Sequence, residues 1–146
     1  MGERTSQREI GSHENLCFRC ERVTHLSAKE VVAHKVNELL KQALGGRADV
    51  LMSAVNFGEV YGIILRDHVK DRALAVMTAL RSLPIRLVDA SPARAFYAAE
   101  VKSTYRLYYV DSFAAALAME HKATLVTSDK DFQKMGHSFP ILWLRA

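Results

Sequence analysis

The fold is decided by one stretch of the sequence, residues 109–132, which reads YVDSFAAALAMEHKATLVTSDKDF. Its alanine-rich first half predicts a helix that begins at Asp111, and the run from Thr124 to Thr127 predicts a short strand. Strands that are continuous apolar runs are typical of a parallel sheet covered on both faces. The stretch therefore indicates an α/β fold in which acidic residues follow directly after a strand.

Helices and strands alternate along the rest of the chain, as this fold class requires. A helix is predicted from Ser27, where Ser27 and Glu30 fit a capping box, to the stop at Gly45 and Gly46. The other predicted elements are a buried strand at 50–52, helices at 56–68 and 70–82, a strand at 85–88, a helix that starts at Ser91-Pro92 and runs to about Leu107, and a final strand at 140–144.

The first residues of the chain differ from the rest. Residues 1–26 have no clear period, and their one short apolar stretch, Leu16 to Phe18, is a poor candidate for the central strand of such a sheet. A length of 146 residues without an internal repeat or linker fits one domain. We therefore predict an atypical N-terminal segment at 1–29, with a degenerate or replaced first strand, and one domain at 30–146.

Composition and charge limit the class of protein. With 49% hydrophobic and 25% charged residues, the chain is too apolar to be disordered, and no window reaches the uninterrupted apolar run of a membrane span. The polar first residues lack the apolar core of a signal peptide, so we expect a cytoplasmic protein. A net charge of +4 and a pI near 9.2 agree with a polyanionic partner without establishing one.

Cys17 and Cys20 form a lone Cys-x-x-Cys pair. Such a pair could be half of a zinc site or a redox pair. Zinc would need two more ligands, and His13 and His25 stand at spacings that no common zinc finger uses. The alternative is two ordinary cysteines.

Three carboxylates, Glu59, Asp111 and Asp129, stand at junctions between predicted strands and helices. Because parallel strands end at the same edge of a sheet, all three could meet there. Glu59 and Asp111 also lie within apolar runs, where a carboxylate costs free energy unless it is paired or metal-bound. For Asp111 and Asp129 the alternative is helix capping. Together the three carboxylates suit Mg²⁺ or Mn²⁺, which could orient a water for phosphodiester cleavage.

At these acidic residues the sequence resembles the PIN-domain ribonucleases of the VapC toxin type. The resembling stretches are SAVNFGEV at 53–60, YVDSFAAALA at 109–118 and LVTSDKDF at 125–132, within a likeness that covers roughly residues 30–146. It implies a three-layer α/β/α domain with a central parallel sheet, RNA cleavage that depends on Mg²⁺ or Mn²⁺, a homodimer, and pairing with a VapB-like antitoxin. By residue, it implies catalytic metal ligands at Glu59, Asp111 and Asp129, a supporting hydroxyl at Thr127 and an auxiliary acid at Asp131.

The first acidic motif of that family is missing. In the family an aspartate ends the first strand, whereas here no aspartate occurs before Asp49. Glu21 lies near the expected place and is either a replacement or a solvated glutamate; the first 30 residues could also derive from a shifted reading frame. We therefore expect a weak or inactive toxin-like ribonuclease. The alternatives are a non-catalytic PIN-like protein that binds an antitoxin or RNA, and a phosphatase or DNA nuclease that uses the same carboxylates.

The helical region 56–82 holds more apolar residues than one buried face requires. Part of it is predicted to form an interface with a second copy or a small antitoxin; the alternative is that both helices belong to the core. The residues concerned are Ile63, Ile64, Leu65, Val76, Met77 and Leu80.

Overall fold

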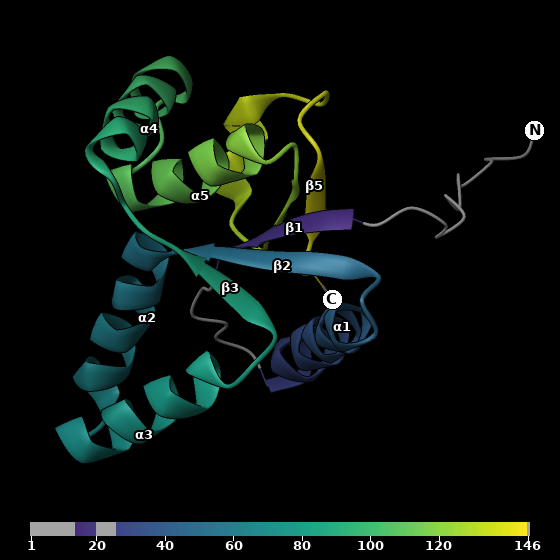
Figure 1. Cartoon of the computed structure of the whole chain (residues 1–146), viewed down its shortest axis with the longest axis vertical. Helices are drawn as coiled ribbons and strands as arrows, with labels where there is room; N and C mark the ends of the chain where they lie inside the picture. Colours follow the sequence, from purple (N-terminus) through teal and green to yellow (C-terminus); the bar gives the residue numbers. More distant parts are fainter. Residues whose placement is uncertain (1–13, 20–25, 146) are drawn as a thin grey trace, which may run out of the picture.

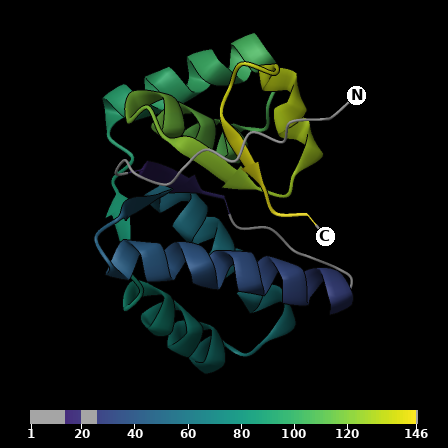
Figure 2. The ribbon, with the colours of Figure 1, turned by 90° about the vertical axis from the view of Figure 1, so that its right-hand side faces the viewer.

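The computed structural model describes residues 14–19 and 26–145, which form a five-stranded parallel sheet with helices on both faces (Figure 1, Figure 2). The strand order is β3-β2-β1-β4-β5, so the first strand is the central one. This arrangement confirms the predicted α/β class. The elements are β1 (Glu14–Phe18), α1 (Leu26–Leu44), β2 (Ala48–Ser53), α2 (Ala54–Asp67), α3 (Lys70–Arg81), β3 (Ile85–Val88), α4 (Pro92–Tyr105), α5 (Tyr109–Glu120), β4 (Thr124–Thr127), the 3₁₀ helix η1 (Lys130–Met135) and β5 (Ile141–Trp143).

Each face of the sheet has its own apolar core. On one face α5 packs against β1, β2 and β4, and α4 packs on α5; on the other face α1 packs against β2. Successive residues of β1 divide between the two cores, with Cys17 on the α5 side and Leu16 and Phe18 on the α1 side. A strand buried on both faces explains why its sequence is an apolar run without alternation. None of the described helices is both long enough and apolar enough to cross a membrane.

The N-terminal strand is intact, and the prediction that it is degenerate or replaced was wrong. β1 pairs with β2 on one side and with β4 on the other, and Leu16 lies opposite Val50 and Thr124. Leu16 and Cys17 are 1% and 0% exposed. Five residues suffice here because a central strand receives hydrogen bonds from two neighbours and buries both of its faces. The polar residues around Leu16 to Phe18 stand at the ends of the strand.

Helix starts lie close to their predicted positions. The cap at Ser91 is confirmed, because its side chain accepts a hydrogen bond from the Arg94 amide and Pro92 occupies the first turn. α2 begins two residues earlier than predicted, because Ser53 ends β2 and its side chain accepts from the Val55 amide. β2 thus turns directly into α2, which fixes where the side chain of Glu59 lies.

Candidate functional site

The candidate site lies at the carboxyl edge of the sheet, where ligands bind in folds of this type. Three adjacent strands end there. β1 ends at Phe18 and is followed by Arg19, β2 leads through Ser53 into α2 and Glu59, and β4 ends at Thr127, just before Asp129. The first turn of α5 adds Asp111.

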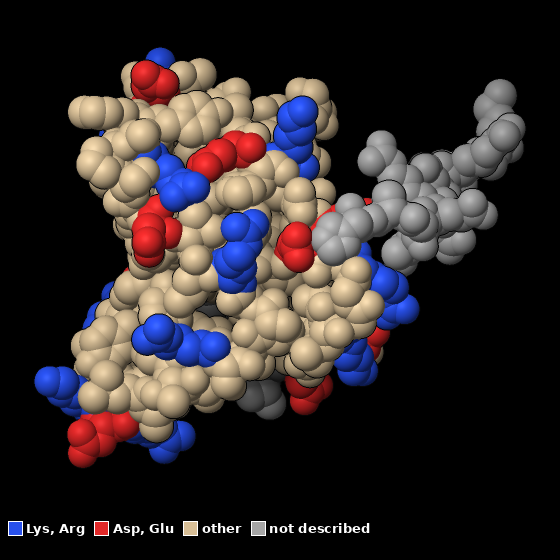
Figure 3. Space-filling model, viewed as in Figure 1, with Lys and Arg blue, Asp and Glu red and all other residues tan. Residues whose placement is uncertain are grey.

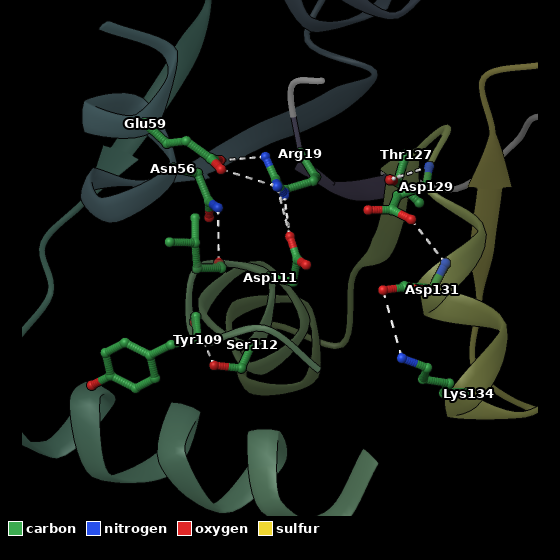
Figure 4. A network of polar contacts seen from close by, with 11 residues as sticks. Arg19, Asn56, Glu59, Tyr109, Asp111, Ser112, Thr127, Asp129, Asp131 and Lys134 are labelled. Atoms are coloured by element: carbon green, nitrogen blue, oxygen red, sulfur yellow. Dashed lines mark hydrogen bonds and ion pairs between the residues drawn. The ribbon is translucent and has the colours of Figure 1, made fainter. Parts of the chain in front are cut away.

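Arg19 is at the centre of this site, although no sequence pattern had marked it as a functional residue. Its guanidinium lies between the carboxylates of Glu59 and Asp111 (Figure 4). Nε and Nη2 each lie 2.6 Å from Oδ1 of Asp111, Nη2 donates to Oε1 of Glu59 at 3.3 Å, and Nη1 pairs with Oε2 of Glu59. The residue is only 7% exposed. One cation therefore joins the end of β1 to α2 and α5.

Asp111 is the most deeply buried of these carboxylates, with an exposed fraction of 2%. Burial raises the pKa of Asp111, the nearby Arg19 guanidinium opposes that rise, and the negative charges of Asp129 and Asp131 add to it. Asn56 holds the first turn of α5, because its amide donates to the Val110 carbonyl at 3.0 Å. The Oδ1 atom of Asn56 is buried and has no hydrogen-bond partner among the described residues. The contacts that Arg19 makes with Asp111, and that Asn56 makes with the first turn of α5, therefore hold the buried Asp111 carboxylate in a fixed place.

Asp129 has a local structural role in addition to its charge. Its side chain accepts from the amide of Asp131 at 2.8 Å and caps η1, while its own amide donates to Oγ1 of Thr127 at 3.1 Å. The capping alternative thus describes Asp129, and Thr127 supports the turn that carries it. Oδ2 of Asp131 lies 3.5 Å from Nζ of Lys134. The sequence-predicted residues therefore divide into Glu59 and Asp111, which share Arg19, and Asp129 with Thr127 and Asp131 on the turn after β4.

The arrangement does not fit the Mg²⁺ or Mn²⁺ ion that the resemblance implies. Within residues 14–19 and 26–145, no three histidine, cysteine or acidic side chains are grouped so that they could hold a metal ion. Two of the three predicted ligands pair instead with a guanidinium, whose positive charge repels any cation brought to the same oxygens. Glu21, the suggested replacement for the missing aspartate, lies outside the described residues.

Cys17 behaves as an ordinary core cysteine. It is fully buried, its thiol donates to the Ala114 carbonyl at 3.3 Å, and burial raises its pKa to about 12. A thiol that stays protonated at neutral pH is a poor metal ligand and a poor nucleophile. Cys20 lies outside the described residues.

An apolar groove of about 380 Å³ opens beside the charged site. It runs between α1, α2 and α3, and because Arg19 and Ser128 belong to its lining, it reaches the carboxyl edge of the sheet. Four of the six apolar residues singled out in the sequence line it, whereas Met77 is buried and Leu65 is not part of the lining. The apolar lining is Phe18, Val32, Val36, Leu40, Met52, Val60, Ile63, Ile64, Val76, Leu80, Leu83, Ile85 and Leu144.

The surface has no single charge sign on the face shown in Figure 3, where Lys and Arg side chains are interspersed with Asp and Glu. One exposed pair of this kind joins Arg94 of α4 to Glu120 of α5. The basic pI therefore does not correspond to a continuous basic patch on this face.

Comparison with known proteins identifies a matching family. The sequence pattern of the PIN domain matches residues 23–138. Similar solved structures include VapBC-1 from nontypeable Haemophilus influenzae, with a TM-score of 0.65, 14% sequence identity, and coverage of 89% of this chain and 98% of that one. VapBC2 from Rickettsia felis, bound to a DNA fragment from their promoter, has a TM-score of 0.62, 15% identity, and coverage of 88% of this chain and 97% of that one. FitAcB from Neisseria gonorrhoeae is similar as well, with a TM-score of 0.60, 18% identity, and coverage of 89% of this chain and 97% of that one. A comparison with curated protein sequences gives no match.

Proposed function

The chain belongs to the PIN domain family, and we propose that it is a VapC-like member that acts by binding an antitoxin-like partner in the cytoplasm, without metal-dependent cleavage of RNA. This was the alternative to a toxin-like ribonuclease in the sequence-based interpretation. One observation carries the choice: the Arg19 guanidinium lies between the carboxylates of Glu59 and Asp111.

The ion pairs of Arg19 oppose catalysis for an electrostatic reason. A divalent cation needs ionised oxygens that no other cation already neutralises, and Mg²⁺ also gives up its bound waters reluctantly. Arg19 and Asp111 are both almost fully buried, so a metal ion would have to displace a guanidinium that cannot lose its proton. The same reasoning disfavours a phosphatase or DNA nuclease that uses these carboxylates.

The apolar groove supports a helical partner. An amphipathic helix binds a groove of this kind with its apolar side chains at successive turns. The walls of the groove are themselves three helices, and Val76 on the rim is 41% exposed, so apolar surface is available to a partner. That the similar structures include VapBC complexes and a toxin-antitoxin complex from Klebsiella pneumoniae supports a small antitoxin as the partner. Self-association into a homodimer remains part of the proposal.

An RNA-cleavage assay tests the catalytic half of the proposal. The purified protein is incubated with total RNA in Mg²⁺, in Mn²⁺ and in chelator, beside the Asp111→Asn variant. We expect no cleavage that depends on the metal and none that distinguishes the two proteins. Cleavage in Mg²⁺ that disappears both with chelator and with Asp111→Asn would establish the ribonuclease instead.

Two neighbouring residues of α2 allow a matched test of the binding half. Ile64 lines the groove, whereas Leu65 does not and is 39% exposed. The tagged protein is purified from its own cells, its mass is measured by light scattering, and any small copurified polypeptide is identified. We expect Ile64→Asp to lose that polypeptide and Leu65→Asp to keep it. A monomer without any bound polypeptide, at high concentration, would refute the proposed partner and the homodimer together.

A further inference from the structure

We propose that the guanidinium of Arg19 is a built-in replacement for a divalent cation, and that the single substitution Arg19→Asp would turn the acidic site into one that binds Mn²⁺ or Mg²⁺. The inference rests on the proposed function and deepens it, because it explains why the site would not support metal-dependent cleavage of RNA. It concerns cation binding, however, and it can fail or hold independently of RNA cleavage.

The position of Arg19 in the chain is the first support. Arg19 directly follows Phe18, the last residue of the central strand, at the carboxyl edge of the sheet. The backbone there is fixed, because the Arg19 amide donates to the Val126 carbonyl of β4 at 3.0 Å. The side chain at position 19 therefore leaves the sheet between α2 and α5. An aspartate at this position would start from the same point and add a carboxylate to the site.

Charge balance is the second support. Two carboxylates and one guanidinium, as found here, leave a net local charge of one negative unit. Three carboxylates around one divalent cation leave the same net charge. Replacing aspartate by arginine thus removes one ligand and supplies the counter-charge in the same step, so the remaining carboxylates can stay ionised without a metal ion.

The geometry of the guanidinium is the third support. Arginine has a planar set of donors, and Arg19 uses them on two different carboxylates, with Nε and Nη2 on Asp111 and Nη1 and Nη2 on Glu59. A divalent cation bridges carboxylates in a comparable way, by contacting oxygens from separate elements. A lysine, with one compact charged group, would not span both carboxylates in this manner.

The burial of the cluster is the fourth support. The side chains of Arg19 and Asp111 are 8% and 3% exposed, and that of Glu59 is 28% exposed. Carboxylates removed from water to this degree require a partner of opposite charge. If Arg19 were replaced by aspartate, a third carboxylate would join those of Glu59 and Asp111 with no cation among them, and folding would then depend on a cation from solution.

The test compares three proteins: the natural chain, Arg19→Asp and Arg94→Asp. Arg94 is a matched control, because it also pairs with a carboxylate through two nitrogens but at the surface. Thermal unfolding is followed in chelator, Mg²⁺ and Mn²⁺, and bound Mn²⁺ is counted directly by electron paramagnetic resonance. We expect the natural chain and Arg94→Asp to bind no Mn²⁺ and to show no cation-dependent change in Tm. We expect Arg19→Asp to unfold at a lower temperature in chelator and to gain about 5 °C or more with Mn²⁺ at roughly 100 times its dissociation constant.

The outcomes separate the inference from the proposed function. Stoichiometric Mn²⁺ binding by the natural chain would overturn the inference, whether or not RNA is cleaved. An Arg19→Asp protein that folds only with Mn²⁺ would support it; one that folds in no condition, or that ignores Mn²⁺, would overturn it. Adding Asp111→Asn to Arg19→Asp should remove the response to Mn²⁺. A natural chain that binds no Mn²⁺ but is a monomer at high concentration without any bound polypeptide would refute the proposed function and leave this inference standing.

Discussion

Two arginines of this protein make similar ion pairs in different surroundings. Arg19 joins Glu59 and Asp111 at the centre of the sheet edge, where its side chain is 8% exposed. Arg94 joins Glu120 through contacts of 2.8 and 3.0 Å between α4 and α5, where the two side chains are 33% and 35% exposed. The contact distances are alike, but water reaches the Arg94 pair far more freely than it reaches the Arg19 side chain.

The comparison shows that geometry alone does not determine what an ion pair contributes. At the surface, water and salt solvate both partners when the pair is broken, so the loss is small. In the buried cluster, removal of one partner leaves a charge without water or a counter-ion, which is far more costly. The arginine at the end of β1 should therefore be a structural necessity, whereas the one on α4 should be dispensable.

The largest predicted effect is that of Arg19→Met. Methionine keeps much of the side-chain length but leaves Glu59 and Asp111 without their counter-ion. We expect a loss of about 3–5 kcal/mol in the free energy of unfolding. Urea denaturation followed by circular dichroism measures it. A loss below about 1 kcal/mol would mean that the cluster is as well solvated as the surface pair, and the comparison would fail.

Asp111→Asn should have an intermediate effect. Asparagine keeps the shape of the buried side chain, and Arg19 keeps its contacts with Glu59. Because burial already raises the pKa of Asp111, part of the cost of its charge is removed with the charge. We expect a loss of about 1–3 kcal/mol, measured in the same way. A loss equal to that of Arg19→Met would show that Glu59, although paired, contributes nothing to holding the arginine.

Much of the fold could be predicted from the sequence, because the strands 50–52, 85–88 and 124–127 are apolar runs between amphipathic helices. β1 was misjudged for a physical reason. Leu16 to Phe18 is short and has polar neighbours, and a sequence pattern does not reveal that two flanking strands would supply its hydrogen bonds. Central position, which is a property of the whole sheet, compensates for the weak local signal.

The candidate site was predictable only in its acidic half. Glu59 and Asp111 attracted attention because carboxylates within apolar sequence need a partner. The sequence patterns point to a metal ion and to a fourth acid such as Glu21 as that partner, and none of them points to Arg19. An arginine directly after a buried strand, in a chain whose acids lie within apolar sequence, is itself the signal. Charge balance, rather than a motif, would have found it.

The surface pair should be nearly neutral to mutation. Arg94→Met removes the contacts with Glu120 and with the Asp89 carbonyl, and the Glu120 carboxylate left behind remains accessible to water. We expect a loss of about 0.2–1 kcal/mol, which shrinks further at high salt. Denaturation at low and high salt checks this, with Arg19→Met beside it. If the two variants lost equal stability, burial would not be the deciding factor.

The smallest predicted effect concerns pH and uses the surface pair alone. The hydrogen bond from Arg94 holds the pKa of Glu120 below its ordinary value of 4.5, partial burial opposes that shift, and His121 adds to it. A carboxyl whose pKa is lower in the folded state stabilises the fold above its unfolded pKa, and this contribution disappears as the pH falls through the folded pKa. The natural chain should therefore exceed Glu120→Gln in stability at pH 7, by no more than about 1 kcal/mol, and the difference should vanish well below pH 4.5. Denaturation curves of both proteins across this range measure the difference. A gap that persists undiminished in acid would show that Glu120 acts through packing or neutral hydrogen bonding, and the pair would then no longer serve as the solvated counterpart of the buried cluster.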